Sequence, residues 1–107
     1  MINELIKQAH ENAIEKGWWK EPKSFGELIA LCHSELSEAL EFYRIGWEPN
    51  EFGHPTSPPD GIPAELADVI IRIFDMAGYY NIDLEKAITE KMKYNKTRTY
   101  KHGGKRI

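Results

Sequence analysis

The segment IPAELADVIIRIFDMAGYYN, residues 62–81, decides the fold, because its apolar side chains recur at the spacing of one face of an α-helix. Glu65 and Asp68 stand one turn apart on the opposite face, which also carries Arg72 and Asp75. The apolar face consists of six residues, namely Leu66, Val69, Ile70, Ile73, Phe74 and Ala77. The segment therefore predicts a long helix with one buried face and one polar face that bears an acidic pair.

A second helix is predicted over residues 24–45, and it carries a matching acidic pair, Glu35 and Glu38. Ser24 and Glu27 have the spacing of a capping box, which marks the start of a helix. When the helix is turned by about 100° per residue, Glu35 falls within the apolar arc and Glu38 at its edge. A buried carboxylate without a partner is costly, so we expect Glu35 either to be protonated or to be paired with a cation.

The rest of the chain predicts two more helices and one long loop. Residues 3–16 have a helical pattern that Asn3 can cap, and residues 83–98 form a further helix that begins at the cap Asp83. Residues 46–61 hold four of the six prolines, which favours a loop over a strand. Because no alternating strand pattern occurs, the predicted fold class is all-α, a four-helix bundle.

Composition limits the number of domains and the class of protein. The 107 residues fit one domain, residues 1–107, and a net charge of −3 argues against a general nucleic-acid binder. Cys32 is the single cysteine, which excludes an internal disulfide, fits a reducing cytoplasm and suits the apolar arc of its helix. No signal peptide or membrane span is visible, so we expect a cytoplasmic protein. A chain this short buries only about two thirds of its unfolded surface, which favours association with further copies.

The two acidic pairs together predict a metal site. On two antiparallel helices, the pairs Glu35 and Glu38 and Glu65 and Asp68 would place four carboxylates around one small volume. That much negative charge would push the helices apart unless cations lie between them. An all-oxygen set suits Mg²⁺ or Mn²⁺, whereas zinc fits poorly because the four histidines are scattered. A di-iron site would show Glu-x-x-His motifs, and the chain has none.

The predicted fourth helix is basic on one face. Lys91, Asn95 and Arg98 recur at i, i+4 and i+7, and with Lys101 and His102 they are placed to neutralise phosphate oxygens. Residues 91–107 hold seven of the 14 lysines and arginines and no acidic residue. The alternative interpretation of this pattern is a solvated basic tail.

The order and spacing of these motifs resemble the MazG-like nucleoside triphosphate pyrophosphohydrolases, an all-α family that includes dimeric dUTPases and dCTP pyrophosphatases. The hallmark Glu-x-x-Glu and Glu-x-x-Asp motifs are Glu35-Leu-Ser-Glu38 and Glu65-Leu-Ala-Asp68 in this chain. The sequence KMKYNKTRTY, residues 91–100, is similar to the Lys-x-x-x-Asn-x-x-Arg-x-Tyr segment of the family. The resemblance covers residues 25–102, but Ser34 stands where many members have an additional glutamate.

The resemblance implies a reaction and a role for each motif. A nucleoside triphosphate, NTP or dNTP, would be hydrolysed to the monophosphate and pyrophosphate with Mg²⁺ or Mn²⁺, as in cleaning of the nucleotide pool. Glu38 would orient or deprotonate the attacking water in addition to binding metal. Lys91 and Arg98 would stabilise charge on the phosphates, and Asn95 and Tyr100 would hold phosphate or sugar oxygens.

The nucleobase needs an aromatic or apolar slot, for which Trp18 and Trp47 are candidates beside Trp19. Each of these tryptophans has the alternative of core or subunit packing. The family assembles as dimers or tetramers whose active sites draw on a neighbouring subunit, so the resemblance also implies a homo-oligomer that completes the bundle.

Two other classes of function compete with the enzyme. A non-catalytic helical interaction module, in which the carboxylates are surface charge and the basic tail binds nucleotides or nucleic acid, predicts no dependence on Mg²⁺ and no effect of changing Glu35. A nucleic-acid binder that uses the basic tail predicts affinity for DNA or RNA that falls steeply with salt.

Overall fold

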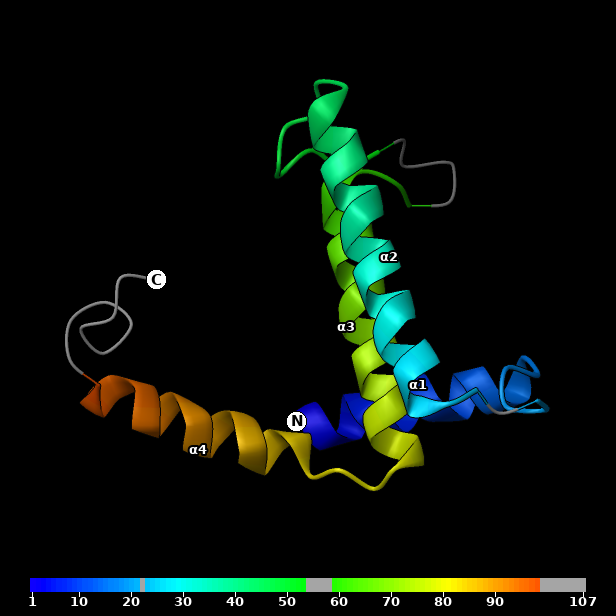
Figure 1. The fold of residues 1–107 in the computed structure, drawn as a ribbon, viewed down its shortest axis with the longest axis vertical. Helices are drawn as coiled ribbons and strands as arrows, with labels where there is room; N and C mark the ends of the chain where they lie inside the picture. The colour runs from blue at the N-terminus through cyan, green and yellow to red at the C-terminus, as the bar shows by residue number, and fades with distance from the viewer. Residues whose placement is uncertain (22, 54–58, 99–107) are drawn as a thin grey trace.

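The computed structural model describes residues 1–21, 23–53 and 59–98. These residues form four helices and no strand, which confirms the all-α class (Figure 1). The helices are α1 (Ile2–Glu15), α2 (Phe25–Arg44), α3 (Ile62–Tyr79) and α4 (Leu84–Thr97). Within the described ranges, none of the helices combines the length and the apolar character that crossing a bilayer requires.

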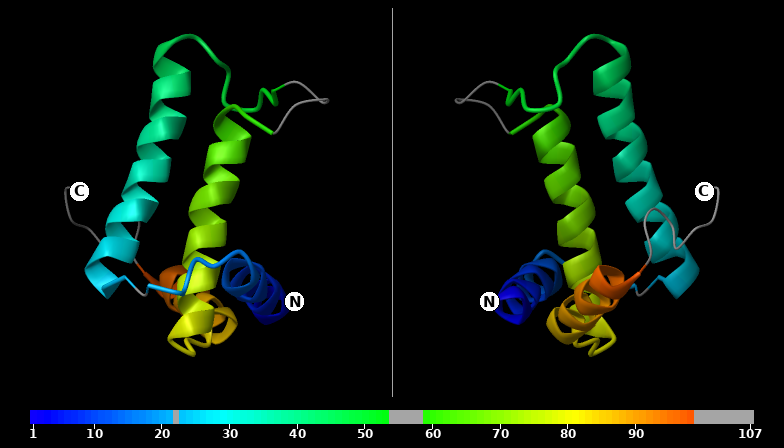
Figure 2. Two further views of the ribbon diagram at one scale, coloured as in Figure 1. Left: turned by 90° about the vertical axis from the view of Figure 1, so that its right-hand side faces the viewer. Right: turned by 90° about the vertical axis from the view of Figure 1, so that its left-hand side faces the viewer.

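Helices α2 and α3 run antiparallel and side by side, joined by the loop at one end (Figures 1 and 2). Leu28, Cys32 and Met76 form the buried cluster between them, and Trp19 and Ile73 pack against it. Cys32 is therefore a core residue, as its place on the apolar arc predicted. This pairing brings the acidic motif of α2 opposite that of α3.

The predicted helix starts are confirmed at two of three sites. Ser24 accepts a hydrogen bond from the backbone of Glu27, and the Glu27 side chain accepts one from Ser24, which completes the capping box. Asp83 caps α4. Asn3 does not cap its own helix, because α1 begins one residue earlier with Met1 at the cap position.

Asn3 instead joins the starts of α1 and α4. Its side-chain oxygen accepts a hydrogen bond from the backbone of Glu85 at 3.3 Å, and its amide donates to Asp83 at 3.0 Å. In return, the Glu85 carboxylate accepts from the backbone of Ile2 at 2.7 Å. From this junction α4 extends away from the α2–α3 pair (Figure 1). The helices α1, α2 and α3 thus pack together, and α4 contacts this group through α1.

Asp75 corrects the sequence-based view of α3. The helical pattern placed Asp75 on the polar face, but the residue is buried, with 8% of its surface exposed. Its Oδ1 accepts hydrogen bonds from Trp19 Nε1 at 2.9 Å and from His10 Nδ1 at 2.8 Å. Tyr79 stacks on Trp19 with ring centroids 4.0 Å apart. The polar face of α3 is therefore covered at this end by α1 and the segment that follows it.

Candidate metal centre

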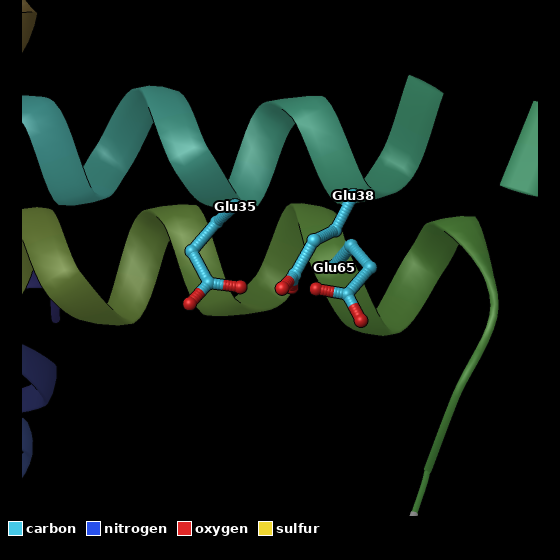
Figure 3. Close-up of side chains that lie close together, drawn as sticks. All are labelled: Glu35, Glu38 and Glu65. Carbon is cyan, nitrogen blue, oxygen red and sulfur yellow. The ribbon is translucent and has the colours of Figure 1, made fainter. Parts of the chain in front are cut away.

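Three carboxylates from α2 and α3 converge on one point, as the sequence predicted. Glu35, Glu38 and Glu65 each offer an oxygen, and these oxygens lie within 4.8 Å of one another (Figure 3). Glu35 and Glu65 are half-buried, whereas Glu38 is exposed. One turn of α2 separates the first two residues, and the antiparallel neighbour supplies the third. The fold therefore gathers carboxylates from positions 30 residues apart in the chain.

Glu65 has the most perturbed environment of the three. Burial raises its pKa to about 7, and hydrogen bonds of its protonated form to Glu38 and Glu35 and the negative charges of Glu38 and Asp68 add to this effect. Its Oε2 is buried, and no N–H or O–H donor within the described residues reaches it. A proton shared between carboxylates, a cation or a water molecule would satisfy this oxygen.

Glu35 differs from Glu65 because it has a cationic partner. Arg72 Nε donates to Glu35 Oε1 at 2.9 Å, and the Glu35 side chain is only 13% exposed. Burial alone would raise the pKa of Glu35, but the hydrogen bond from Arg72, assisted by those to Glu38 and Glu65, lowers it below its ordinary value. Sequence reasoning expected a proton or a cation at Glu35, and it did not identify Arg72. The position of Arg72 on the same face of α3 as Glu65 and Asp68 was the available signal.

Asp68 lies beside the three converging carboxylates rather than among them. It lines the same cavity as Glu35 and Arg72. Burial and the charge of Glu35 raise the pKa of Asp68, and the charge of Arg72 opposes this shift. The predicted set of four thus appears as three oxygens that meet at one point and a fourth carboxylate at the rim of the adjoining cavity.

That cavity has a volume of 760 Å³ and lies between α1 and α3. Trp18 lines it together with Glu35 and Asp68, so one of the predicted nucleobase contacts adjoins the carboxylates. Most of the remaining wall is apolar, with amide side chains from α1. These wall residues include Leu5, Gln8, Ala9, Asn12, Ile71 and Phe74. A cavity of this size that ends at a charged rim is the usual form of a small-molecule site.

The other two tryptophans have packing roles in the structure. Trp19 is the hydrogen-bond partner of Asp75 described above. Trp47 packs edge-on against Phe42, with ring centroids 5.0 Å apart, and approaches the start of α3 so closely that a Cβ at Gly61 would lie 3.2 Å from its ring. Trp47 is therefore held at the loop end of the helix pair, and it is not among the residues that line the cavity.

The predicted phosphate-binding residues of α4 do not meet the carboxylates of the same chain. Lys91 and Asn95 are exposed on α4, and Arg98 is exposed directly after its end. Helix α4 points away from the α2–α3 pair (Figure 1). Lys91 and Arg98 flank the ring of Tyr94, at 5.2 and 5.8 Å from its centroid. Three other predicted contacts, namely Tyr100, Lys101 and His102, lie outside the described residues.

The donor set fits a hard divalent cation. All the converging atoms are carboxylate oxygens, which Mg²⁺ and Mn²⁺ prefer, and the described residues place no histidine or cysteine among them. The buried Oε2 of Glu65, which no donor within the described residues reaches, is available to such an ion. Glu35, Glu38 and Glu65 would hold such an ion, with Asp68 at the edge of the cavity.

The raised pKa of Glu65 leads to a prediction about stability in EDTA. A carboxyl whose folded pKa of about 7 exceeds its ordinary 4.5 stabilises the folded protein below pH 4.5, and this stabilisation is lost as the pH rises through 7. We expect the free energy of unfolding to fall by on the order of 1 kcal/mol between pH 5 and 8, since solvent screens part of the repulsion. Urea unfolding at a series of pH values measures this.

Glu65→Gln should flatten that pH dependence, because glutamine does not titrate. Glu41→Gln is the matched control, since Glu41 is exposed on α2 and pairs with Arg44 at 3.3 Å. The lowered pKa of Glu35 does not interfere, because its contribution is lost only at pH values below 4.5. Equal pH profiles for the wild type and Glu65→Gln would contradict the prediction.

Comparisons of the chain with protein-family models, with curated proteins and with solved structures found no match. The geometry of the carboxylates and the adjoining cavity is therefore the basis for a functional conclusion.

Proposed function

We propose that the chain is a MazG-like nucleoside triphosphate pyrophosphohydrolase, which uses Mg²⁺ or Mn²⁺ to hydrolyse an NTP or dNTP to the monophosphate and pyrophosphate. The observation that carries this proposal is the meeting of Glu35, Glu38 and Glu65 within 4.8 Å. The proposed setting is the cytoplasm, where the enzyme removes unwanted nucleotides from the pool. The residue motifs given above support the choice of family.

The chemistry follows from the charges at the site. A bound divalent cation supplies Lewis-acid charge to phosphate oxygens and favours ionisation of water. Glu38 is exposed at the open side of the three carboxylates and accepts a proton from the attacking water. The water oxygen forms a bond to the α-phosphorus, the bond from that phosphorus to the bridging oxygen breaks, and pyrophosphate leaves with the electron pair. Glu35 and Glu65, the less exposed of the three carboxylates, would hold the cation.

The cavity beside the carboxylates would receive the nucleoside. Its 760 Å³ exceeds the volume of a nucleobase with its sugar, and Trp18 offers a ring face for stacking. Asn12 and Gln8 contribute amides, which can donate to and accept from the edge of a base. The phosphates would then extend toward Glu35 and Asp68, beside the carboxylates that would hold the cation.

We also propose that the enzyme is a homodimer or homotetramer. Helix α2 exposes an apolar stripe at the helical spacing of Leu36, Leu40 and Tyr43, whose exposures are 46%, 58% and 61%. Leu66 and Ile70 of α3, which the sequence pattern assigned to the core, are also exposed. Burial of such surface is the main driving force for association. A second copy would cover the stripe and bring its own α4 to the carboxylates.

The direct test of the proposed activity is hydrolysis of a panel of canonical and modified NTPs and dNTPs with Mg²⁺, with Mn²⁺ or with EDTA. Chromatography separates the products. We expect a monophosphate and pyrophosphate in equal amounts, only with metal, and the rate across the panel identifies the preferred base. Release of inorganic phosphate instead would contradict the proposed reaction, and no product from any triphosphate would favour the interaction module.

Lys91→Ala is expected to raise KM for the triphosphate about tenfold, because it removes one charge-assisted contact to phosphate. Lys93→Ala is the matched control, since Lys93 is also exposed on α4 but is not part of the face formed by Lys91, Asn95 and Arg98. Steady-state kinetics of both variants measures the effect. An unchanged KM for Lys91→Ala would show that Lys91 of α4 does not contact the triphosphate.

Mixing two chains with different defects tests whether α4 acts on a neighbouring subunit. If it does, a mixture of Glu38→Gln and Lys91→Ala chains contains hybrid oligomers with one intact site. At low substrate concentration, turnover of the mixture should exceed that of either variant alone. Turnover equal to the mean of the two variants would place both residues in one chain's site.

A further inference from the structure

Arg72 connects the carboxylates to the cavity through two contacts. Its Nε donates to Glu35 Oε1 at 2.9 Å, and its guanidinium carbon lies 5.1 Å from the centroid of the Trp18 ring. Its side chain is 30% exposed, so most of it is enclosed between α2, α3 and the segment after α1. One planar cation therefore spans the distance from a candidate metal ligand to a candidate base-stacking ring.

The contact with Glu35 restricts how that carboxylate is turned. A carboxylate has two oxygens, and binding of Oε1 by Arg72 leaves the other for the point where Glu38 and Glu65 converge. In Figure 3 one oxygen of Glu35 is directed toward Glu38 and the other away from it. Arg72 follows Glu65 by seven residues, about two turns along α3.

The contact with Trp18 links the same guanidinium to the cavity. A cation over an indole face is attracted by the ring electrons, and it restricts where the ring can lie. Trp18 carries a second cation, Lys23, whose Nζ is 4.2 Å from the ring centroid. If a ligand in the cavity displaced the Trp18 ring, the Arg72 guanidinium would shift with it. Because Arg72 binds Glu35, the Glu35 carboxylate would shift as well.

We propose that Arg72 is a positioning residue of the metal centre. It orients Glu35 toward the cation and couples metal binding to the position of the Trp18 ring. This inference rests on the proposed function and assigns a role that the sequence motifs leave open. It predicts two separate effects of changing Arg72. The affinity for metal falls, and the response of Trp18 to metal is lost.

The first test is the affinity for Mn²⁺ alone, measured by electron paramagnetic resonance of the free ion. Loss of an outer-shell partner of a metal ligand costs about 10- to 100-fold in metal affinity, so we expect Arg72→Gln to bind Mn²⁺ more weakly by that factor. Arg72→Lys keeps the charge but not the planar guanidinium, so its affinity for Mn²⁺ should lie between those of the wild type and Arg72→Gln. Arg44→Gln is the matched control, because Arg44 pairs with Glu41 on the surface of α2, and its affinity should equal that of the wild type.

The second test is tryptophan fluorescence on addition of Mg²⁺. The contribution of Trp18 is the difference between a protein and its Trp18→Phe version. We expect Mg²⁺ to change this contribution in an otherwise wild-type background and to leave it unchanged with Arg72→Gln. Urea unfolding of each variant shows that the fold is retained, so that lost binding is not lost structure.

The outcomes separate this inference from the proposed function. If the wild type binds Mn²⁺ and Arg72→Gln binds it equally well or more tightly, Arg72 is a bystander or a competing cation. The positioning role is then wrong, whereas the metal centre stands. If the wild type binds no Mn²⁺, the proposed function and the inference are both wrong.

Discussion

Replacing Glu38 with glutamine is expected to lower Mg²⁺-dependent triphosphate turnover about 10²- to 10⁴-fold, the range for loss of a general base. Glutamine keeps the shape of the side chain but cannot accept the proton of the attacking water, and it is a weaker ligand for a hard cation. Initial rates at saturating Mg²⁺ and triphosphate measure the loss. Because Glu38 is exposed at the open side of Glu35 and Glu65, no packing is disturbed.

The same substitution should leave the fold intact or make it more stable. Glu38 contributes to the raised pKa of Glu65 through a hydrogen bond and through its charge, so its negative charge opposes folding in EDTA. Removing that charge relieves repulsion, and the free energy of unfolding should equal or exceed that of the wild type. A substitution that lowers turnover and raises the free energy of unfolding indicates that the residue serves function rather than folding.

Glu41→Gln provides the comparison on the same helix. Glu41 lies less than one turn after Glu38 and pairs with Arg44 on the surface, so both turnover and stability should stay near wild-type values. Near-normal turnover of Glu38→Gln, with the metal requirement retained, would show that another group takes the proton and that the role given to Glu38 is wrong.

The helices and the acidic pairs could be predicted because their signals are local. Ser24 and Glu27 form the predicted capping box, and the spacing of Glu35 and Glu38 places both on one side of α2. The apolar arc of α2 also predicted that Glu35 would be protonated or paired with a cation, and Arg72 is the cation that binds it. Patterns of three to four residues are enough for conclusions of this kind.

The direction of α4 could not be predicted, because contacts between distant residues determine it. Asn3 was interpreted as a cap of its own helix, but its side chain bonds to Asp83 and Glu85, about 80 residues away. These bonds tie the start of α4 to the start of α1 and direct the basic face away from the carboxylates. A polar side chain near a helix start has several available partners, and the local sequence does not choose among them.

Asp75 shows the same limit on α3. Its helical position matches the polar face of Glu65 and Asp68, yet the end of α3 is covered by α1 and Trp19, so the carboxylate is buried. The pattern of α3 alone describes which residues share a face. It does not describe how far along that face a neighbouring helix extends, and this decides which carboxylates are exposed.

Asp75→Ala is therefore expected to destabilise the protein by about 3 kcal/mol, because two donors lose their shared acceptor in a covered site. A carboxylate only accepts hydrogen bonds, so both His10 Nδ1 and Trp19 Nε1 carry the protons in these contacts. For a chain of this size, a loss of that magnitude lowers Tm by on the order of 10 °C. Calorimetry or thermal unfolding followed by circular dichroism measures the shift.

Asp75→Asn separates the hydrogen bonds from the packing. Asparagine keeps one acceptor oxygen of nearly the same shape, so it should recover a large part of the stability that alanine loses. Trp19→Phe removes one of the two donors and, with Asp75→Ala, forms a double-mutant cycle whose coupling energy reports that hydrogen bond directly. A coupling energy near zero, together with equal Tm values for the wild type and Asp75→Ala, would mean that water serves these donors as well as the carboxylate does. In that case α1 would be held on α3 by its apolar contacts alone.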